Sequence, residues 1–137
     1  MSLFVDSSVW FAAIDSSDIY NARAKELLTT DEALLTTDHI VLETWFLLRN
    51  RIDRNAAEGY WAGLRTGIAG VEPVGLADLE AAWQIGLAFP DQDFSLVDRT
   101  SFAVMQRLGI ERVATFDNHF AIFRYGPRQQ RAFEMVR

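Results

Sequence analysis

Four acidic residues occupy positions where a carboxylate is either costly or well placed for chemistry. Asp6 and Asp117 each directly follow a short apolar run that is typical of a buried strand. Glu43 lies in a helical pattern whose neighbouring positions are largely apolar, where an unpaired carboxylate is unfavourable. Asp98 follows Ser95 at the spacing of a capping box, and its side chain can still point into a site. If they converge, these carboxylates form an acidic pocket.

Converging carboxylates repel one another, so such a pocket requires protons or divalent cations. At a separation of about 5 Å and an effective dielectric constant of about 20, each pair of like charges repels by roughly 3 kcal/mol. Oxygen ligands select hard ions, Mg²⁺ or Mn²⁺, over zinc. The two histidines, His39 and His119, lack the paired spacing of zinc ligands, and we expect both to be structural.

Each acid also has a structural interpretation. Asp6 is suited to the N-terminus of a helix, Asp117 to an Asp-Asn turn, and Asp98 to the capping box alone. For Glu43 the alternative is an ion pair with an arginine from elsewhere in the chain. Asp93 either adds charge to the rim of the pocket or is simply an acid in a turn.

Short apolar runs alternate with helical periodicity along the chain, which predicts an α/β fold. The predicted strands cover residues 3–5, 33–36, 71–74 and 112–116. The predicted helices cover about 9–14 (capped by Ser7 or Ser8), 21–28, 38–49 (capped by Asp38), 55–65, 77–88 and 95–108. In a parallel sheet, Asp6 and Asp117 would both lie at the carboxyl ends of strands, where open α/β sheets form ligand sites.

Length and composition exclude several classes of protein. A chain of 137 residues predicts one domain, residues 1–137. The absence of cysteine excludes disulfide scaffolds, cysteine nucleophiles and thiolate metal sites. No apolar run approaches the ~20 residues that span a membrane, and the N-terminus has no signal-peptide pattern, so we expect a soluble, cytoplasmic protein. No phosphate-binding loop or dinucleotide fingerprint occurs.

Basic residues are few but clustered. Thirteen basic and nineteen acidic residues give a net charge of −6, which argues against binding nucleic acid by bulk attraction. The candidates for local phosphate contacts are Arg49, Arg51, Arg54 and Arg124. The alternative is that these arginines complement a helix dipole or are merely solvated.

The order and spacing of the acidic motifs resemble those of PIN-domain ribonucleases over essentially the whole chain. In order, the motifs are Val5-Asp6-Ser7-Ser8, Leu42-Glu43, Ser95-Leu96-Val97-Asp98 and Ala114-Thr115-Phe116-Asp117 with Phe120. Each motif is weak alone, whereas the ordered set of four is fairly specific. The chain is most similar to the small VapC-like toxins of toxin–antitoxin pairs.

The resemblance implies a three-layer sandwich: a mostly parallel sheet of strand order 3-2-1-4-5 with helices on both faces. It implies Mg²⁺- or Mn²⁺-dependent endonucleolytic cleavage of single-stranded or looped RNA. Asp6 and Asp98 would be the principal catalytic metal ligands, with Glu43 and Asp117 completing the pocket. It also implies a cognate antitoxin and a homodimer as partners, with the arginines as a rim for RNA.

Two other functions remain open on the sequence. The chain could be a PIN-fold nuclease with a non-toxin role, either DNA cleavage or RNA processing. It could also be a non-catalytic module that binds RNA or protein. The module predicts no stabilisation by metal, whereas a repulsive acidic cluster should gain thermal stability as Mn²⁺ fills it.

Overall fold

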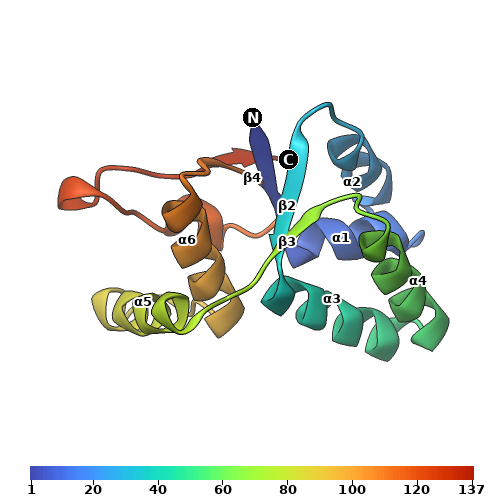
Figure 1. The fold of residues 1–137 in the computed structure, drawn as a ribbon, viewed down its shortest axis with the longest axis horizontal. Helices are drawn as coiled ribbons and strands as arrows, with labels where there is room; N and C mark the ends of the chain where they lie inside the picture. Colours follow the sequence, from blue (N-terminus) through green and yellow to red (C-terminus); the bar gives the residue numbers. More distant parts are fainter.

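A five-stranded sheet runs through the middle of the molecule (Figure 1). The computed structural model describes all residues, 1–137. Its strands are β1 Ser2–Val5, β2 Ala33–Thr37, β3 Gly70–Glu72, β4 Arg112–Ala114 and β5 Glu134–Val136. Every neighbouring pair is parallel and the order is β3-β2-β1-β4-β5, which confirms the predicted topology.

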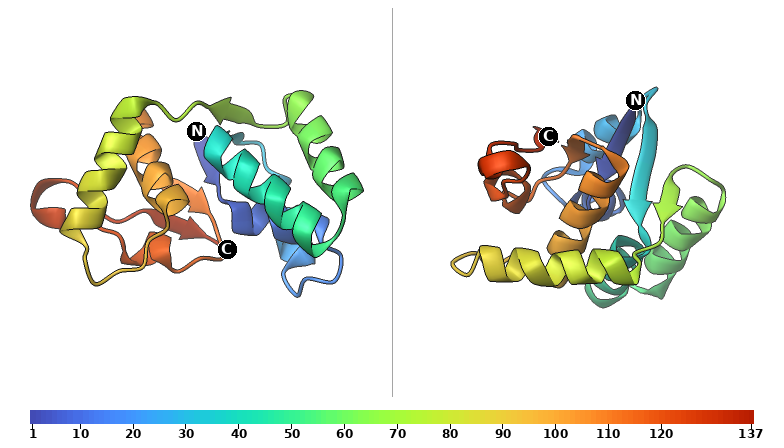
Figure 2. Two further views of the ribbon diagram at one scale, coloured as in Figure 1. Left: turned by 90° about the horizontal axis from the view of Figure 1, so that it is seen from below. Right: turned by 60° about the vertical axis from the view of Figure 1, so that its left-hand side comes forward.

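Helices cover both faces of this sheet. They are α1 Ser7–Ile14, α2 Asn21–Leu28, α3 Asp38–Arg51, α4 Arg54–Arg65, α5 Leu76–Ala88, α6 Leu96–Leu108 and α7 His119–Ile122, followed by a 3-10 turn at Pro127–Gln129. In Figure 1, α1, α2 and α4 lie to the right of the sheet and α5 and α6 to its left. In the left view of Figure 2, α5 and α6 pack together on the side away from α3 and α4. None of the helices combines the length and hydropathy needed to cross a membrane.

The centre of the sheet is its most buried part. Leu3, Phe4 and Val5 of β1 are each at most 2% exposed, because β1 is paired on both edges and covered on both faces. The register sets Val5 of β1 opposite Ala114 of β4, so these two neighbouring strands end side by side. Any residue that directly follows β1 is therefore brought close to the residues that follow β4.

Several local details differ from the sequence-based expectations. The N-cap of α3 is Thr37, whose hydroxyl accepts from Ile40 N at 3.1 Å, whereas Asp38 Oδ1 accepts from Val74 N at 2.9 Å. Strand β4 ends at Ala114, earlier than the predicted end at residue 116, and the hydroxyl of Thr115 donates to Asp6 Oδ2. The local pattern did not predict β5 or α7, because segments of three and four residues carry too little periodicity.

Candidate active site

Asp6 lies at the carboxyl end of the central strand β1, where its backbone N–H donates to Ala114 O at 3.0 Å. Its side chain is buried at 4% exposure and accepts hydrogen bonds at Oδ2 from Ser8 Oγ and Thr115 Oγ1, both at 2.9 Å. Burial raises the pKa of Asp6 to about 6; the two hydroxyls oppose this shift, and the charge of Asp98 adds to it. The carboxyl of Asp6 therefore keeps its proton to a higher pH than an ordinary aspartate does.

Glu43 reaches the same place from α3. Ser7 Oγ donates to Glu43 Oε1 at 2.5 Å and lies 3.4 Å from Asp6 Oδ1, so one hydroxyl joins the two acids. Burial raises the pKa of Glu43, the bond from Ser7 opposes the shift, and the charges of Asp98 and Asp117 reinforce it. The ion pair that we considered for Glu43 is not formed.

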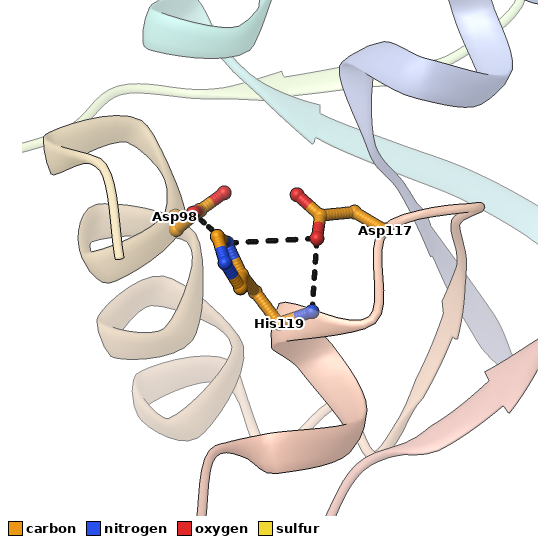
Figure 3. A group of neighbouring side chains, drawn as sticks. All are labelled: Asp98, Asp117 and His119. Carbon is orange, nitrogen blue, oxygen red and sulfur yellow. Dashed lines mark hydrogen bonds and ion pairs between the residues drawn. The ribbon is translucent and has the colours of Figure 1, made fainter. Parts of the chain in front are cut away.

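Asp98 and Asp117 face each other on opposite sides of His119 (Figure 3). His119 Nδ1 lies 2.8 Å from Asp98 Oδ2 and 3.5 Å from Asp117 Oδ1, and one ligand atom from each of the three residues lies within 4.8 Å of the others. Asp98 also completes the capping box of α6, because its Oδ2 accepts from Ser95 N at 3.0 Å. The structural and functional interpretations of Asp98 are thus compatible.

Asp98 and His119 both have raised pKa values. Burial raises the pKa of Asp98, opposed by the hydrogen bonds from His119 and Ser95 N and reinforced by the charge of Asp117. Partial burial lowers the pKa of His119, but the bond to Asp98 and the charges of both aspartates outweigh it, so the net shift is upward. The exposed Asp93 adds to that upward shift, as expected of an acid at the rim.

His119 is the residue that sequence reasoning missed. We expected it to be structural, yet it contacts two of the four acids. Its place inside the closing motif, two residues after Asp117, was the available signal. His39, by contrast, forms no ion pair with an acid, and Thr100 Oγ1 lies 3.4 Å from its Nδ1.

The acidic cluster (Asp6, Glu43, Asp98 and Asp117) consists of two groups. Ser7 joins Asp6 and Glu43, whereas Asp98 and Asp117 have ligand atoms within 4.8 Å of each other and of His119. The donors of this cluster fit a hard divalent cation. They are carboxylate oxygens, with one imidazole nitrogen beside them, and no lysine or arginine forms an ion pair with any of the four. Burial is the largest cause of the raised pKa values of three of these acids, Asp6, Glu43 and Asp98. A cation of charge +2 at the cluster would favour their ionised forms.

Of the four candidate arginines, Arg51 lies nearest to this chemistry, since it lines a hollow together with Ser7 and Ser8. Arg49 is exposed in the last turn of α3, and Arg54 is exposed and paired with Glu58 at 3.4 Å. Arg124 lines a different hollow beside α5. Of the four candidate arginines, only Arg51 therefore shares a hollow with residues that contact the acidic cluster, Ser7 and Ser8.

Comparisons with known proteins identify the family of this chain. The family model of the PIN domain matches residues 3–124. The 23S rRNA-specific endonuclease VapC20 of Mycobacterium tuberculosis is 36% identical over 121 residues, which cover 87% of this chain and 92% of the relative. The ribonuclease VapC26 of the same species is 23% identical over 124 residues, covering 89% and 92%.

Solved structures show the same fold. The crystal structure of Mycobacterium tuberculosis VapC20, described as a sarcin–ricin loop cleaving toxin, matches with a TM-score of 0.83 at 33% identity and covers 88% of this chain and 93% of that one. The structure of VapBC2 from Rickettsia felis bound to a promoter DNA fragment matches over the full length of both chains with a TM-score of 0.64, and its 8% identity makes this a likeness of fold alone. The chain is a member of the PIN domain family.

Proposed function

We propose that this chain is a single PIN-like domain that cleaves phosphodiester bonds inside RNA with the help of Mg²⁺ or Mn²⁺, as the toxin of a toxin–antitoxin pair. The observation that supports this most directly is the group of Asp98 and Asp117 beside His119, close enough for the charge of Asp98 to raise the pKa of both Asp6 and Glu43. No arginine or lysine forms an ion pair with any of the four acids. A metal-dependent nuclease requires such a cluster, whereas a binding module gains nothing from it.

Asp6 and Asp98 would be the principal ligands of the cation, with Glu43 and Asp117 completing the set. The cation would supply Lewis-acid activation of water and neutralise charge that develops on the phosphate. The hydroxyls of Ser8 and Thr115 fix the carboxylate of Asp6 from two sides.

The protein's other polar groups position acids and protons around the cleaved bond. Ser7 favours the ionised form of Glu43 by donating to it. His119 orients Asp98 through its Nδ1, and its raised pKa favours the protonated ring. We assign His119 a positioning role beside the acids.

The substrate class follows from the relatives. VapC20 is described as specific for 23S rRNA and as cleaving the sarcin–ricin loop. We propose a looped RNA of this kind for this chain, because unpaired nucleotides expose their backbone and bases to the acidic cluster.

Two protein partners belong to the same proposal: a cognate antitoxin and a second copy of the chain. Large apolar side chains stand exposed on two helices, Leu42 and Phe46 on α3 and Trp83 and Leu87 on α5, each between 56% and 61% exposed. Contiguous apolar surface of this kind is typical of protein interfaces.

The test is cleavage of 23S rRNA and of a sarcin–ricin loop oligonucleotide by the purified protein, in Mg²⁺, Mn²⁺ or EDTA. Wild type should cut only with metal, Asp98→Asn should not cut, and Asp91→Asn, which alters an exposed acid in a turn, should cut normally. Cleavage that survives both EDTA and Asp98→Asn would refute the assignment. Equal cutting of single-stranded DNA would favour the non-toxin nuclease, and no cutting together with no thermal stabilisation by Mn²⁺ would favour the binding module.

A further inference from the structure

Two hollows adjoin the acidic cluster and share a pair of aromatic rings. The first, of about 250 Å³, lies between α1, the turn at 15–20 and the end of α3, and its lining includes Ser7, Phe11 and Arg51. The second, of about 330 Å³, is lined by Arg23 and Arg137. Tyr20 and Phe116 line both, and we call the two hollows together the aromatic groove.

The aromatic groove begins at the acidic cluster itself. Ser7 and Ser8 line the first hollow while their hydroxyls contact Glu43 and Asp6. Phe116 directly precedes Asp117, and its backbone N–H donates to Ser8 Oγ at 3.0 Å. A chain molecule with one phosphate at the acidic cluster would therefore have its adjoining units beside these rings.

The aromatic pair is built for contact with a flat ligand. The rings of Tyr20 and Phe116 stack with centroids 4.5 Å apart and planes 17° from parallel. Tyr20 nevertheless remains 47% exposed, and Asp18 Oδ1 fixes its position by accepting from Tyr20 N at 2.8 Å. A rigid, half-exposed aromatic side chain is the usual platform on which an unpaired base stacks.

The aromatic groove is lined by three arginines, Arg51, Arg23 and Arg137, and by one carboxylate, Asp18. The guanidinium of Arg51 lies 5.3 Å from the centre of the Phe11 ring, and no carboxylate pairs with it. In the second hollow, Arg137 Nη1 contacts Asn118 Oδ1 at 2.9 Å, while Arg23 is shared between Glu26 and Arg137 O. Arg51, which has no carboxylate partner, can attract a phosphate that the acidic cluster alone would repel, and Arg23 would exchange Glu26 for a phosphate.

We propose that the aromatic groove binds the unpaired nucleotides that adjoin the cleaved phosphate, with a base stacked on Tyr20 and backbone phosphates contacting Arg51 and Arg23. This inference rests on the proposed nuclease function. It identifies a binding site on the turn at 15–20 that the acidic motifs do not include. Stacking tolerates any base, so the aromatic groove contributes affinity and register more than base identity.

A peptide segment is the competing occupant, and the chemistry favours RNA. The walls of the aromatic groove combine stacked rings with arginines, whereas the molecule's largest hollow, near Trp10 and Tyr60, is mostly apolar and suits a protein helix better. Because Ser7 and Ser8 line the aromatic groove and contact Glu43 and Asp6, a strand cut at the acidic cluster can run along this groove.

The experiment compares Tyr20→Ala with Tyr20→Phe, which keeps the ring, and with Ile19→Ala, which alters an exposed neighbour in the same turn. Binding of a fluorescein-labelled sarcin–ricin loop oligonucleotide is measured by anisotropy in EDTA, where no cleavage occurs. Tyr20→Ala should weaken binding roughly tenfold, while the other two variants stay within about twofold of wild type. In Mg²⁺, Tyr20→Ala should raise KM by a similar factor and leave kcat nearly unchanged.

Arg51→Gln tests the phosphate contact independently, with Arg65→Gln on α4 as the exposed control. Arg51→Gln should make the slope of log affinity against log salt shallower by roughly 0.7, the value for one phosphate contact on a single strand. RNA binding that neither Tyr20→Ala nor Arg51→Gln changes would overturn the proposal and leave the aromatic groove to another occupant, such as a protein segment. Metal-dependent cleavage with unchanged KM in Tyr20→Ala would refute the groove alone, and binding lost in Tyr20→Ala without any cleavage by wild type would refute the nuclease alone.

Discussion

The hydroxyl of Ser7 lies 2.5 Å from Glu43 Oε1 and joins the first turn of α1 to the middle of α3. The same oxygen is 3.4 Å from Asp6 Oδ1, so Ser7 stands between two carboxylates that both have raised pKa values. A hydroxyl has one proton to donate, and the shorter distance gives it to Glu43. Ser7 therefore opposes the protonation of Glu43 that burial would otherwise favour.

Replacing Ser7 by alanine should shift the pH dependence of cleavage upward. Without the hydrogen bond from Ser7, the pKa of Glu43 rises further. Below neutral pH the acidic cluster of the variant is therefore less negative than that of wild type, and it binds metal more weakly. We expect kcat/KM of Ser7→Ala to fall about tenfold near pH 6 and much less near pH 8. Ser2→Ala, an exposed serine in β1, is the control, and a profile of Ser7→Ala that coincides with it would contradict the prediction.

The sequence indicated most of the acidic cluster because three of its members obey local rules. Asp6 and Asp117 follow strands that were recognisable as apolar runs, and parallel pairing brings the ends of such strands together. Glu43 was conspicuous because its helical neighbours are apolar. Asp98 had a strong local explanation as a capping residue, and only the structure shows that its side chain also contacts His119.

What the sequence could not indicate depends on contacts between distant segments. His119 has no partner at metal-ligand spacing, and its approach to Asp98 arises from the packing of α7 beside α6. The aromatic groove joins Tyr20 to Phe116, which are far apart along the chain and adjacent only in the fold. Local periodicity carries no information about such pairs.

In the absence of metal, the stability of the fold should fall as pH rises through the acid range. Asp6 has a pKa of about 6 in the fold against an ordinary value of 3.8, so between these values the folded protein retains a proton that the unfolded chain has released. The stabilisation is complete below about pH 4 and is lost as pH rises through about 6. The two-unit difference corresponds to about 3 kcal/mol of unfolding free energy.

Urea unfolding in EDTA between pH 4 and 7 measures this effect. Asp6→Asn should show a shallower decline than wild type, because the variant has no proton to lose at this position while its amide oxygen can still accept from Ser8 and Thr115. Mn²⁺ at a hundred times its dissociation constant should restore about 2.7 kcal/mol to wild type at neutral pH. Parallel pH curves for wild type and Asp6→Asn would show that Asp6 is ionised throughout.

His119 should act as a proton-dependent counter-charge to Asp98 and Asp117. Its pKa is raised above 6.5, so the stability that the charged ring contributes is present below that value and is lost as pH rises through the raised value. Without metal, His119→Gln should lower the melting temperature at pH 6 and have little effect at pH 8.5. Glutamine disturbs the site least, because its side-chain amide can still donate a hydrogen bond to Asp98 without carrying a charge.

The same proton competes with the cation. Mn²⁺ affinity of wild type should rise as His119 loses its proton, and His119→Gln should bind Mn²⁺ with a weaker dependence on pH, as measured by the thermal shift at several Mn²⁺ concentrations. Complete loss of Mn²⁺ binding at every pH would instead identify His119 as an indispensable ligand. His39→Gln, which changes the other histidine, should behave as wild type toward Mn²⁺.

Thr115 should couple the two strand ends that carry Asp6 and Asp117. Its buried hydroxyl donates to Asp6 Oδ2 and accepts from Asp117 N, both at 2.9 Å. Thr115→Val keeps the shape but removes both bonds, which should destabilise the fold by about 1–3 kcal/mol. The pKa of Asp6 should rise further, because the bond from Thr115 opposes that rise.

The matched control for this change is Thr36→Val. Thr36 is equally buried, in the neighbouring strand β2, and its hydroxyl donates to Val5 O at 3.1 Å without touching an acid. Both variants should unfold at lower urea concentration than wild type, but only Thr115→Val should also need more Mn²⁺ for half-maximal cleavage at pH 7. If the two variants needed equal Mn²⁺, Thr115 would be a structural residue, and the position of Asp6 would depend on Ser8 and the backbone bond to Ala114 instead.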